Sequence, residues 1–125
     1  MAQAGIAAQE SGDGRLLYIA VGERDAIIYV LNIATGEQRP LAGMPKLGIG
    51  NDWVLGSKGI FFVDFGQQPG IDFFDFSSQR VTKRIPLDKQ PKLWGGLSLS
   101  PDETWLAYSQ VDVASSDLML VEGFR

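Results

Sequence analysis

Apolar residues in this chain fall in short runs separated by stretches rich in Gly, Asp, Ser and Pro. The runs contain mostly Ile, Val, Phe, Tyr and Leu, a composition typical of β-strands. In residues 16–21, Leu17, Ile19 and Val21 point to one side, while Leu16, Tyr18 and Ala20 point to the other. Because both sides are apolar, we expect these strands to lie in sheets that are covered on both faces.

The runs also repeat along the chain with a period of roughly 45 residues. Equivalent positions in the first strand of each unit are Ile19, Phe62 and Tyr108, and the second strand opens at Ile28, Ile71 and Leu118. This period is typical of propeller blades, each a four-stranded antiparallel sheet. The sequence therefore predicts an all-β fold, an incomplete β-propeller of about three blades.

The repeat also sets expected boundaries within the chain. Residues 1–10 are predicted to be an N-terminal lead segment, and residues 11–125 the propeller fragment. Blade units are expected at about 11–41, 50–87 and 93–125, with innermost strands near 53–55 and 93–99 and outermost strands near 39–41 and 81–86. The middle unit has all four strands, whereas the last ends after its third.

The turns between strands carry their own signals. Ser100-Pro101-Asp102 favours a type I turn, because proline fixes φ at its second position and Asp can bond to the nearby backbone. Gly36 suits a tight hairpin. The equivalent turn at residues 77–79 has no glycine, so we expect it to be looser.

The composition of the chain excludes several kinds of catalytic and metal site. The chain has no His and no Cys, so it cannot by itself build a Ser-His-Asp triad, an imidazole or thiolate metal site, or a disulfide. The net charge of −4 and the scattered Lys and Arg residues argue against nucleic-acid binding. We expect no enzymatic activity and no cofactor.

Three aspartates in the second unit, Asp64, Asp72 and Asp75, lie within twelve residues and are candidates for a calcium site. They lack the ligand spacing of an EF-hand loop, and Asp72 and Asp75 would point to opposite faces of one strand. Roles at strand edges and in turns are therefore the preferred interpretation.

The chain shows no signal for membrane insertion. No apolar run approaches the ~20 residues that a transmembrane helix needs. The first nine residues are rich in alanine but have no Lys or Arg, so a signal peptide is not expected there. Both a periplasmic and a cytoplasmic location are compatible with these features.

Related strand and turn motifs occur at residues 59–64, 94–102, 105–112 and 116–124, and a weaker repeat covers 11–41. In these motifs the second half of the chain resembles the closing blades of TolB-like, WD40-like (PD40-type) propellers found in bacterial multidomain regulators. The Ser-Pro-Asp turn followed by Trp-Leu-Ala-Tyr-Ser is similar to the repeat signature of that family. Two positions depart from it: Glu103 stands where the turn usually has Gly, and Gly123 where the ending usually has Asn.

This resemblance implies that the last blade receives its fourth strand from the other end of a closed ring, which typically has four to eight blades. Three blades leave two terminal faces uncovered. Exposing several hundred Å² of apolar face would cost on the order of 10 kcal/mol, which rivals the whole stability of a domain. We therefore expect a fragment of a longer protein or a chain that associates, for example two copies approximating a six-bladed ring.

The tryptophans provide a candidate partner surface. Trp53 and Trp94 precede innermost strands, near the rim of the central channel, and tryptophan is favoured at binding surfaces. The candidate surface comprises Asn51, Asp52, Trp53, Lys92 and Trp94. The alternative for both tryptophans is packing between blades, and Trp105 is expected in the core.

The leading functional hypothesis is a non-catalytic binding or sensing module that contacts a protein or ligand within a larger bacterial protein. The alternative is an accessory propeller of a hydrolase or peptidase whose catalytic domain lies elsewhere. A third hypothesis is a freestanding protein that self-assembles. The expected partners are accordingly another protein, the remaining propeller blades or a second copy, with no nucleic acid and no membrane.

Overall fold

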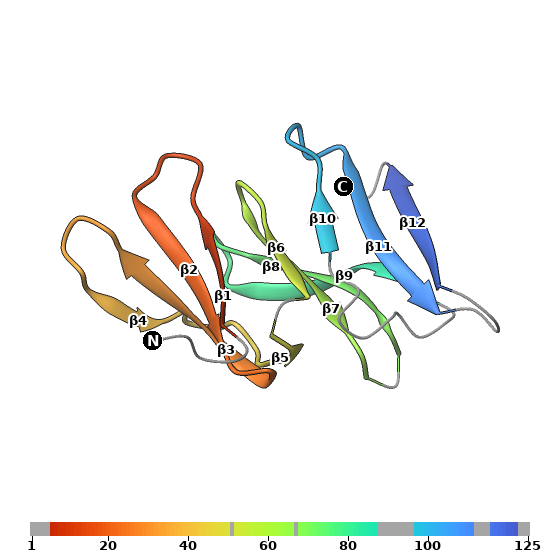
Figure 1. Cartoon of the computed structure of the whole chain (residues 1–125), viewed down its shortest axis with the longest axis horizontal. Coiled ribbons are helices and arrows are strands. Elements are labelled where there is room, and N and C mark those ends of the chain that lie inside the picture. Colours follow the sequence, from red (N-terminus) through yellow and green to blue (C-terminus); the bar gives the residue numbers. More distant parts are fainter. Residues whose placement is uncertain (1–5, 51, 67, 88–96, 112–115, 123–125) are drawn as a thin grey trace.

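The computed structural model describes residues 6–50, 52–66, 68–87, 97–111 and 116–122. These residues form twelve β-strands arranged in three antiparallel sheets (Figure 1). Within the described ranges no helix is long and apolar enough to span a membrane. The predicted all-β fold, a partial propeller, is confirmed.

The first sheet has the order β1-β2-β3-β4, formed by Ile6–Glu10, Leu16–Val21, Arg24–Asn32 and Gln38–Pro40. A short strand, β5 (Leu47–Ile49), pairs with the beginning of β3. The structure differs here from the sequence-based expectation, because part of the lead segment 1–10 is the innermost strand of this sheet. The alanines of β1 have little β-propensity, so the sequence of this segment does not predict a strand. The strand forms because all five residues of β1 pair with β2.

The second sheet consists of β6 (Trp53–Leu55), β7 (Gly59–Asp64), β8 (Gly70–Asp75) and β9 (Arg80–Pro86), in that order. All residues of β7 and β8 except the last of each strand are buried. Ile60 and Phe62 pack toward the first sheet, whereas Phe61 and Val63 pack toward the third. This sheet is covered on both faces, as the apolar residues on both faces of β7 and β8 predict.

The third sheet contains β10 (Leu97–Leu99), β11 (Trp105–Val111) and β12 (Ser116–Glu122). Leu106 and Tyr108 of β11 are buried against the second sheet. The third sheet therefore repeats the arrangement of the second up to its third strand.

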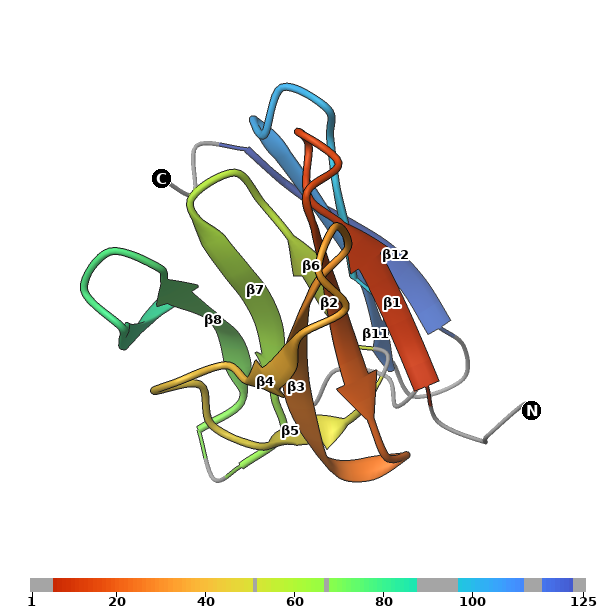
Figure 2. The same cartoon turned by 90° about the vertical axis from the view of Figure 1, so that its left-hand side faces the viewer.

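The three sheets follow one another in sequence order along the longest axis of the molecule (Figure 1). Viewed from its left-hand side, the first sheet lies in front of the others (Figure 2). One hydrophobic cluster, which includes Ile28, Trp53 and Phe74, lies between the first and second sheets. Another, which includes Phe61 and Leu106, lies between the second and third. The described part of the chain is thus held together by two inter-sheet layers.

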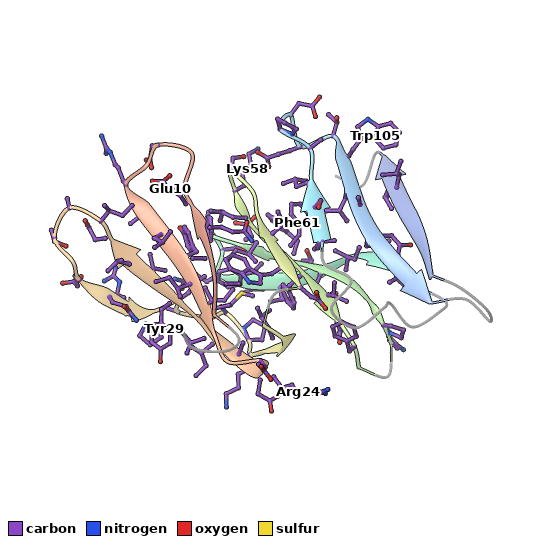
Figure 3. All side chains as sticks on the ribbon, viewed as in Figure 1. Glu10, Arg24, Tyr29, Lys58, Phe61 and Trp105 are labelled. Carbon is purple, nitrogen blue, oxygen red and sulfur yellow. The ribbon has the colours of Figure 1, made fainter. Side chains whose placement is uncertain are left out.

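The outward faces of the two end sheets carry exposed apolar side chains. Val21 and Ile27 face each other across β2 and β3 and are each 37% exposed. On the third sheet Trp105 is 42% exposed and Leu120 is 62% exposed. The expectation that Trp105 belongs to the core is therefore wrong. Its neighbour Leu106 faces the second sheet, so the alternation along β11 turns Trp105 outward (Figure 3).

The turn between β8 and β9 in the second sheet is as tight as the equivalent turn between β3 and β4 in the first. In the first, Asn32 Oδ1 accepts hydrogen bonds from the N–H groups of Ala34 and Thr35, at 3.0 and 3.2 Å. In the second, Asp75 Oδ1 accepts from those of Ser77 and Ser78, at 2.8 and 3.2 Å. The expected looser turn is therefore a wrong prediction, and the reason is Gln79.

Gln79 adopts φ 57°, which corresponds to φ 77° at Gly36, and both residues close the same backbone hydrogen bond. A side chain in this left-handed region costs about 1–2 kcal/mol relative to glycine. Replacing Gln79 with Gly should therefore raise the free energy of unfolding by up to about 1 kcal/mol, after the extra entropy of glycine in the unfolded chain is subtracted. Urea unfolding measures this change. Gly36→Ala should shift stability in the opposite direction, and a destabilised Gln79→Gly protein would contradict the assignment.

Candidate functional site

The structure describes two of the five residues predicted to form a partner surface. Asp52 and Trp53 are buried, at 2% and 1% exposure, at the start of β6. The Trp53 indole Nε1–H donates a hydrogen bond of 2.9 Å to the Gly50 carbonyl, and its ring belongs to the core between the first and second sheets. Trp53 therefore has the packing role that was the alternative interpretation. Asn51, Lys92 and Trp94 lie outside the described residues.

A glutamine side chain connects the innermost strands of the first two sheets. Gln9 of β1 donates from Nε2 to the Trp53 carbonyl at 3.0 Å, and its Oε1 accepts from the Leu55 N–H at 2.7 Å. The amide thus pairs with the edge of β6 in the way that a neighbouring strand would. Nothing in the alanine-rich context of Gln9 signals this role in the sequence.

A carboxylate makes the corresponding connection between the second and third sheets. Both oxygens of Glu103 accept from the Ser57 N–H, at 3.2 and 3.3 Å. Glu103 has φ 60°, which explains why a glycine would suit this position. A Cβ atom on Gly56 would lie 2.9 Å from Glu103 Oε1, so the glycine leaves room for the carboxylate. The feature of the sequence that marks this contact is a glutamate at a turn position whose positive φ favours glycine.

Two turns with the same Ser-x-Asp arrangement hold carboxylates at the same end of the sheets. In the first, Asp13 Oδ1 accepts from the Ser11 hydroxyl at 2.7 Å and from the Arg15 N–H at 3.0 Å. In the third, Asp102 Oδ1 accepts from the hydroxyl groups of Thr104 and Ser100, at 2.6 and 2.8 Å. These hydrogen bonds lower the pKa of both carboxyl groups below the ordinary value of 3.8, so both are charged at neutral pH.

The end of the molecule that carries the Asp13 and Asp102 turns, called the turn end below, also carries Glu10 and Lys58, whereas Arg24 lies at the opposite end (Figure 3). Several open hollows lie among the described residues of the turn end, and three of them form a continuous groove system. We call them the outer, middle and inner grooves, with volumes of about 530, 330 and 290 Å³. The outer and middle grooves share Leu16, Tyr18 and Phe76. The middle and inner grooves share Gly12, Leu55, Gly56 and Ser57. The three are therefore contiguous.

The floor of the outer groove is apolar and partly aromatic. The rings of Tyr18 and Phe76 stack with centroids 5.4 Å apart and an interplanar angle of 15°. Burial raises the pKa of the Tyr18 hydroxyl, so this side chain is neutral. Arg39 lies at the outer groove, Asp13 at the middle groove, and Glu10 and Glu103 at the inner groove. The grooves thus differ in charge from one end to the other.

The three aspartates that are candidates for a calcium site have separate structural roles. Asp64 Oδ1 accepts from the Gly66 N–H at 2.8 Å, in the turn at one end of the second sheet. Asp75 holds the hairpin at the other end. Asp72 is buried in the middle of β8, at 7% exposure. In the part of the chain that the structure describes, no three His, Cys, Asp or Glu residues are grouped closely enough to hold a metal ion.

The sheet order and the two inter-sheet layers define the chain as part of a β-propeller. The chain is similar in structure to TolB from Acinetobacter baumannii, with a TM-score of 0.71 and 14% sequence identity. The similarity covers 94% of this chain but only 29% of the TolB chain. No protein-family model and no curated protein sequence matches the chain. The comparison therefore establishes a TolB-like fold.

Proposed function

We propose that this chain is a non-catalytic binding module that works as part of a larger β-propeller. The observation that carries the proposal is the pair of apolar outward faces on the end sheets, where Val21 and Ile27 lie on one and Trp105 and Leu120 on the other. Apolar faces of this kind mark sites of protein contact. The covering element is a further propeller blade, supplied by the same polypeptide or by a second copy of the chain.

Composition and similarity support this proposal. The absence of His and Cys removes the usual nucleophile–base pairs, and the carboxylates described above are engaged in turns and inter-sheet contacts. The chain spans less than a third of the TolB chain to which it is similar, which is consistent with a role as part of a longer propeller. We further propose that its parent is a bacterial multidomain regulator with PD40-type blades, as the motifs at residues 94–102 and 105–112 suggest.

Sedimentation velocity tests the proposal through the exposed faces. The chain alone should associate in a concentration-dependent way, because stacking two end faces removes apolar surface from water. Placing charges on one face, with Trp105→Glu and Leu120→Glu together, should weaken association by about tenfold or more, since the burial of two large apolar side chains is lost. A sharp monomer boundary for the unmodified chain at about 100 μM, within the μM–mM range in which exposed apolar surface causes aggregation, would contradict it.

A matched control separates the effect of the face from that of added charge. Ile33 and Val81 are also exposed, at 46% and 39%, but they lie in the β3–β4 turn and on the outermost strand of the second sheet. The Ile33→Glu and Val81→Glu double variant should associate like the unmodified chain. Equal weakening in both double variants would show that net charge, not the end face, controls association.

A further inference from the structure

We infer that the contiguous outer, middle and inner grooves at the turn end bind an extended peptide segment of a partner protein, with apolar side chains followed by a basic one. The grooves are lined by residues of all three sheets and of the turns between their strands. The exposed apolar residues of the end faces line none of them: Val21, Ile27, Trp105 and Leu120. The proposed peptide site therefore uses other residues than the contacts in the proposed function.

The apolar part of the peptide is assigned to the outer groove. Its floor is formed by Leu16, Tyr18, Val30, Leu41 and Phe76. A volume of about 530 Å³ lies within the range of pockets that enclose ligand groups. Tyr18 is buried and its ring stacks on the partly buried ring of Phe76, so this floor is rigid and costs little conformational entropy on binding.

The basic part is assigned to the inner groove and its junction with the middle groove. Glu10 and Glu103 line the inner groove beside Val54, Leu55 and Leu99, so carboxylates stand next to aliphatic surface. An arginine or lysine side chain matches this combination, because its aliphatic stem packs while its charged head pairs. Asp13 adds a further charge at the middle groove, where its turn hydrogen bonds keep it ionised.

The arrangement of the positive charges agrees with this direction of binding. Arg39 lines the outer groove, at the far end from Glu10 and Glu103. Lys58 lines an adjoining hollow, which shares Ser57 and Phe76 with the middle groove and is also lined by Asp75. Arg15 lies close enough to influence Asp13 but lines none of the three. A peptide with its basic residue at the outer groove would instead meet Arg39.

Fluorescence anisotropy with two labelled octapeptides tests the inference. One probe alternates serine and leucine and ends in two arginines, and the matched probe ends in two glutamates. At low salt the arginine probe should bind about tenfold more tightly, and this preference should shrink in 0.5 M salt, roughly where screening reduces the range of exposed charges to a few ångströms. Equal binding of both probes, or no saturable binding of either, would overturn the inference.

Variants locate the binding to the grooves. Glu10→Gln together with Glu103→Gln removes two charges but keeps an acceptor for the Ser57 N–H, and should weaken the arginine probe about fivefold, as expected for two exposed ion pairs. The control, Glu23→Gln with Asp25→Asn, removes two charges at the opposite end and should leave binding unchanged. Equal weakening by the control would also overturn the inference.

The same measurement distinguishes this inference from the proposed function. In the Trp105→Glu and Leu120→Glu variant, whose third sheet has a charged face, the arginine probe should bind at least as tightly as to the unmodified chain, because the added charges are negative. Loss of probe binding in that variant would show that the probe binds to the end face and would refute the groove site. Unchanged probe binding by a chain that does not self-associate would support the groove while contradicting the proposed function.

Discussion

Replacing Gly59 with alanine should lower the free energy of unfolding by about 3 kcal/mol or more, a loss at the upper end of what overpacking a core produces. Gly59 begins β7 and is buried opposite Asp75 of β8. A Cβ atom at this position would overlap the carbonyl oxygen of Phe74 and lie 2.6 Å from Cζ of Phe73. Neither neighbour can move easily, because the carbonyl is backbone and the ring is buried. Pairing between the central strands of the middle sheet would therefore be disrupted.

Gly12→Ala is the matched control. Gly12 has no neighbouring atom within 4 Å of the added Cβ and does not adopt positive φ. Its replacement should leave stability unchanged or raise it by up to about 1 kcal/mol, by reducing the entropy of the unfolded chain. Urea unfolding at a concentration where the chain is monomeric provides both values. A Gly59→Ala protein as stable as Gly12→Ala would contradict the close contact between β7 and β8.

Gln9→Leu should lower the free energy of unfolding by about 2–3 kcal/mol, because leucine leaves a partly buried donor and acceptor on β6 without partners. The groups concerned are the Leu55 N–H and the Trp53 carbonyl. Leucine has nearly the same size as glutamine, so the loss reports the hydrogen bonds and not a cavity. Chemical denaturation, monitored by circular dichroism, measures the change.

Gln38→Leu serves as the control for this substitution. Gln38 lies on β4, the exposed edge strand of the same sheet, and surface changes of this kind usually alter stability by less than about 0.5 kcal/mol. Gln9→Glu is a second informative variant, since a carboxylate can still accept from the Leu55 N–H but cannot donate to the Trp53 carbonyl. Its stability should lie between those of the unmodified chain and Gln9→Leu. Equal stability of the Gln9→Leu and Gln38→Leu proteins would refute the connection between the sheets.

The parts of the fold that could be predicted are those with a local signal. The runs that contain Phe62 and Phe74 are apolar on both faces, and this pattern alone indicates a sheet covered on both sides. The repeat then extends the same strand order to the first and third units. The Ser-Pro-Asp motif also predicts the turn that Asp102 stabilises, because its chemistry is contained within five residues.

The parts that could not be predicted depend on neighbours distant in sequence. Strand β1 has no strong hydrophobic pattern and is defined by its pairing with β2. A tryptophan can lie in the core or on the surface, so residue type alone does not place Trp105. Its exposure follows from its position next to Leu106, which faces the second sheet and therefore turns Trp105 outward. Gln9 acts across 44 and 46 residues, which no local motif can encode. Gln79 adopts a left-handed conformation that its residue type disfavours, and the surrounding hairpin imposes it.

Residue-resolved hydrogen exchange on the monomeric chain tests most directly whether the middle sheet is covered on both faces and the end sheets on one. Amides paired between β7 and β8 should exchange slowest, since opening them disrupts both inter-sheet layers. Amides paired between β2 and β3, and between β11 and β12, should exchange at least about tenfold faster, because each of these sheets is held by one layer. Equal protection in all three sheets, or slower exchange in an end sheet than in the middle one, would contradict this architecture.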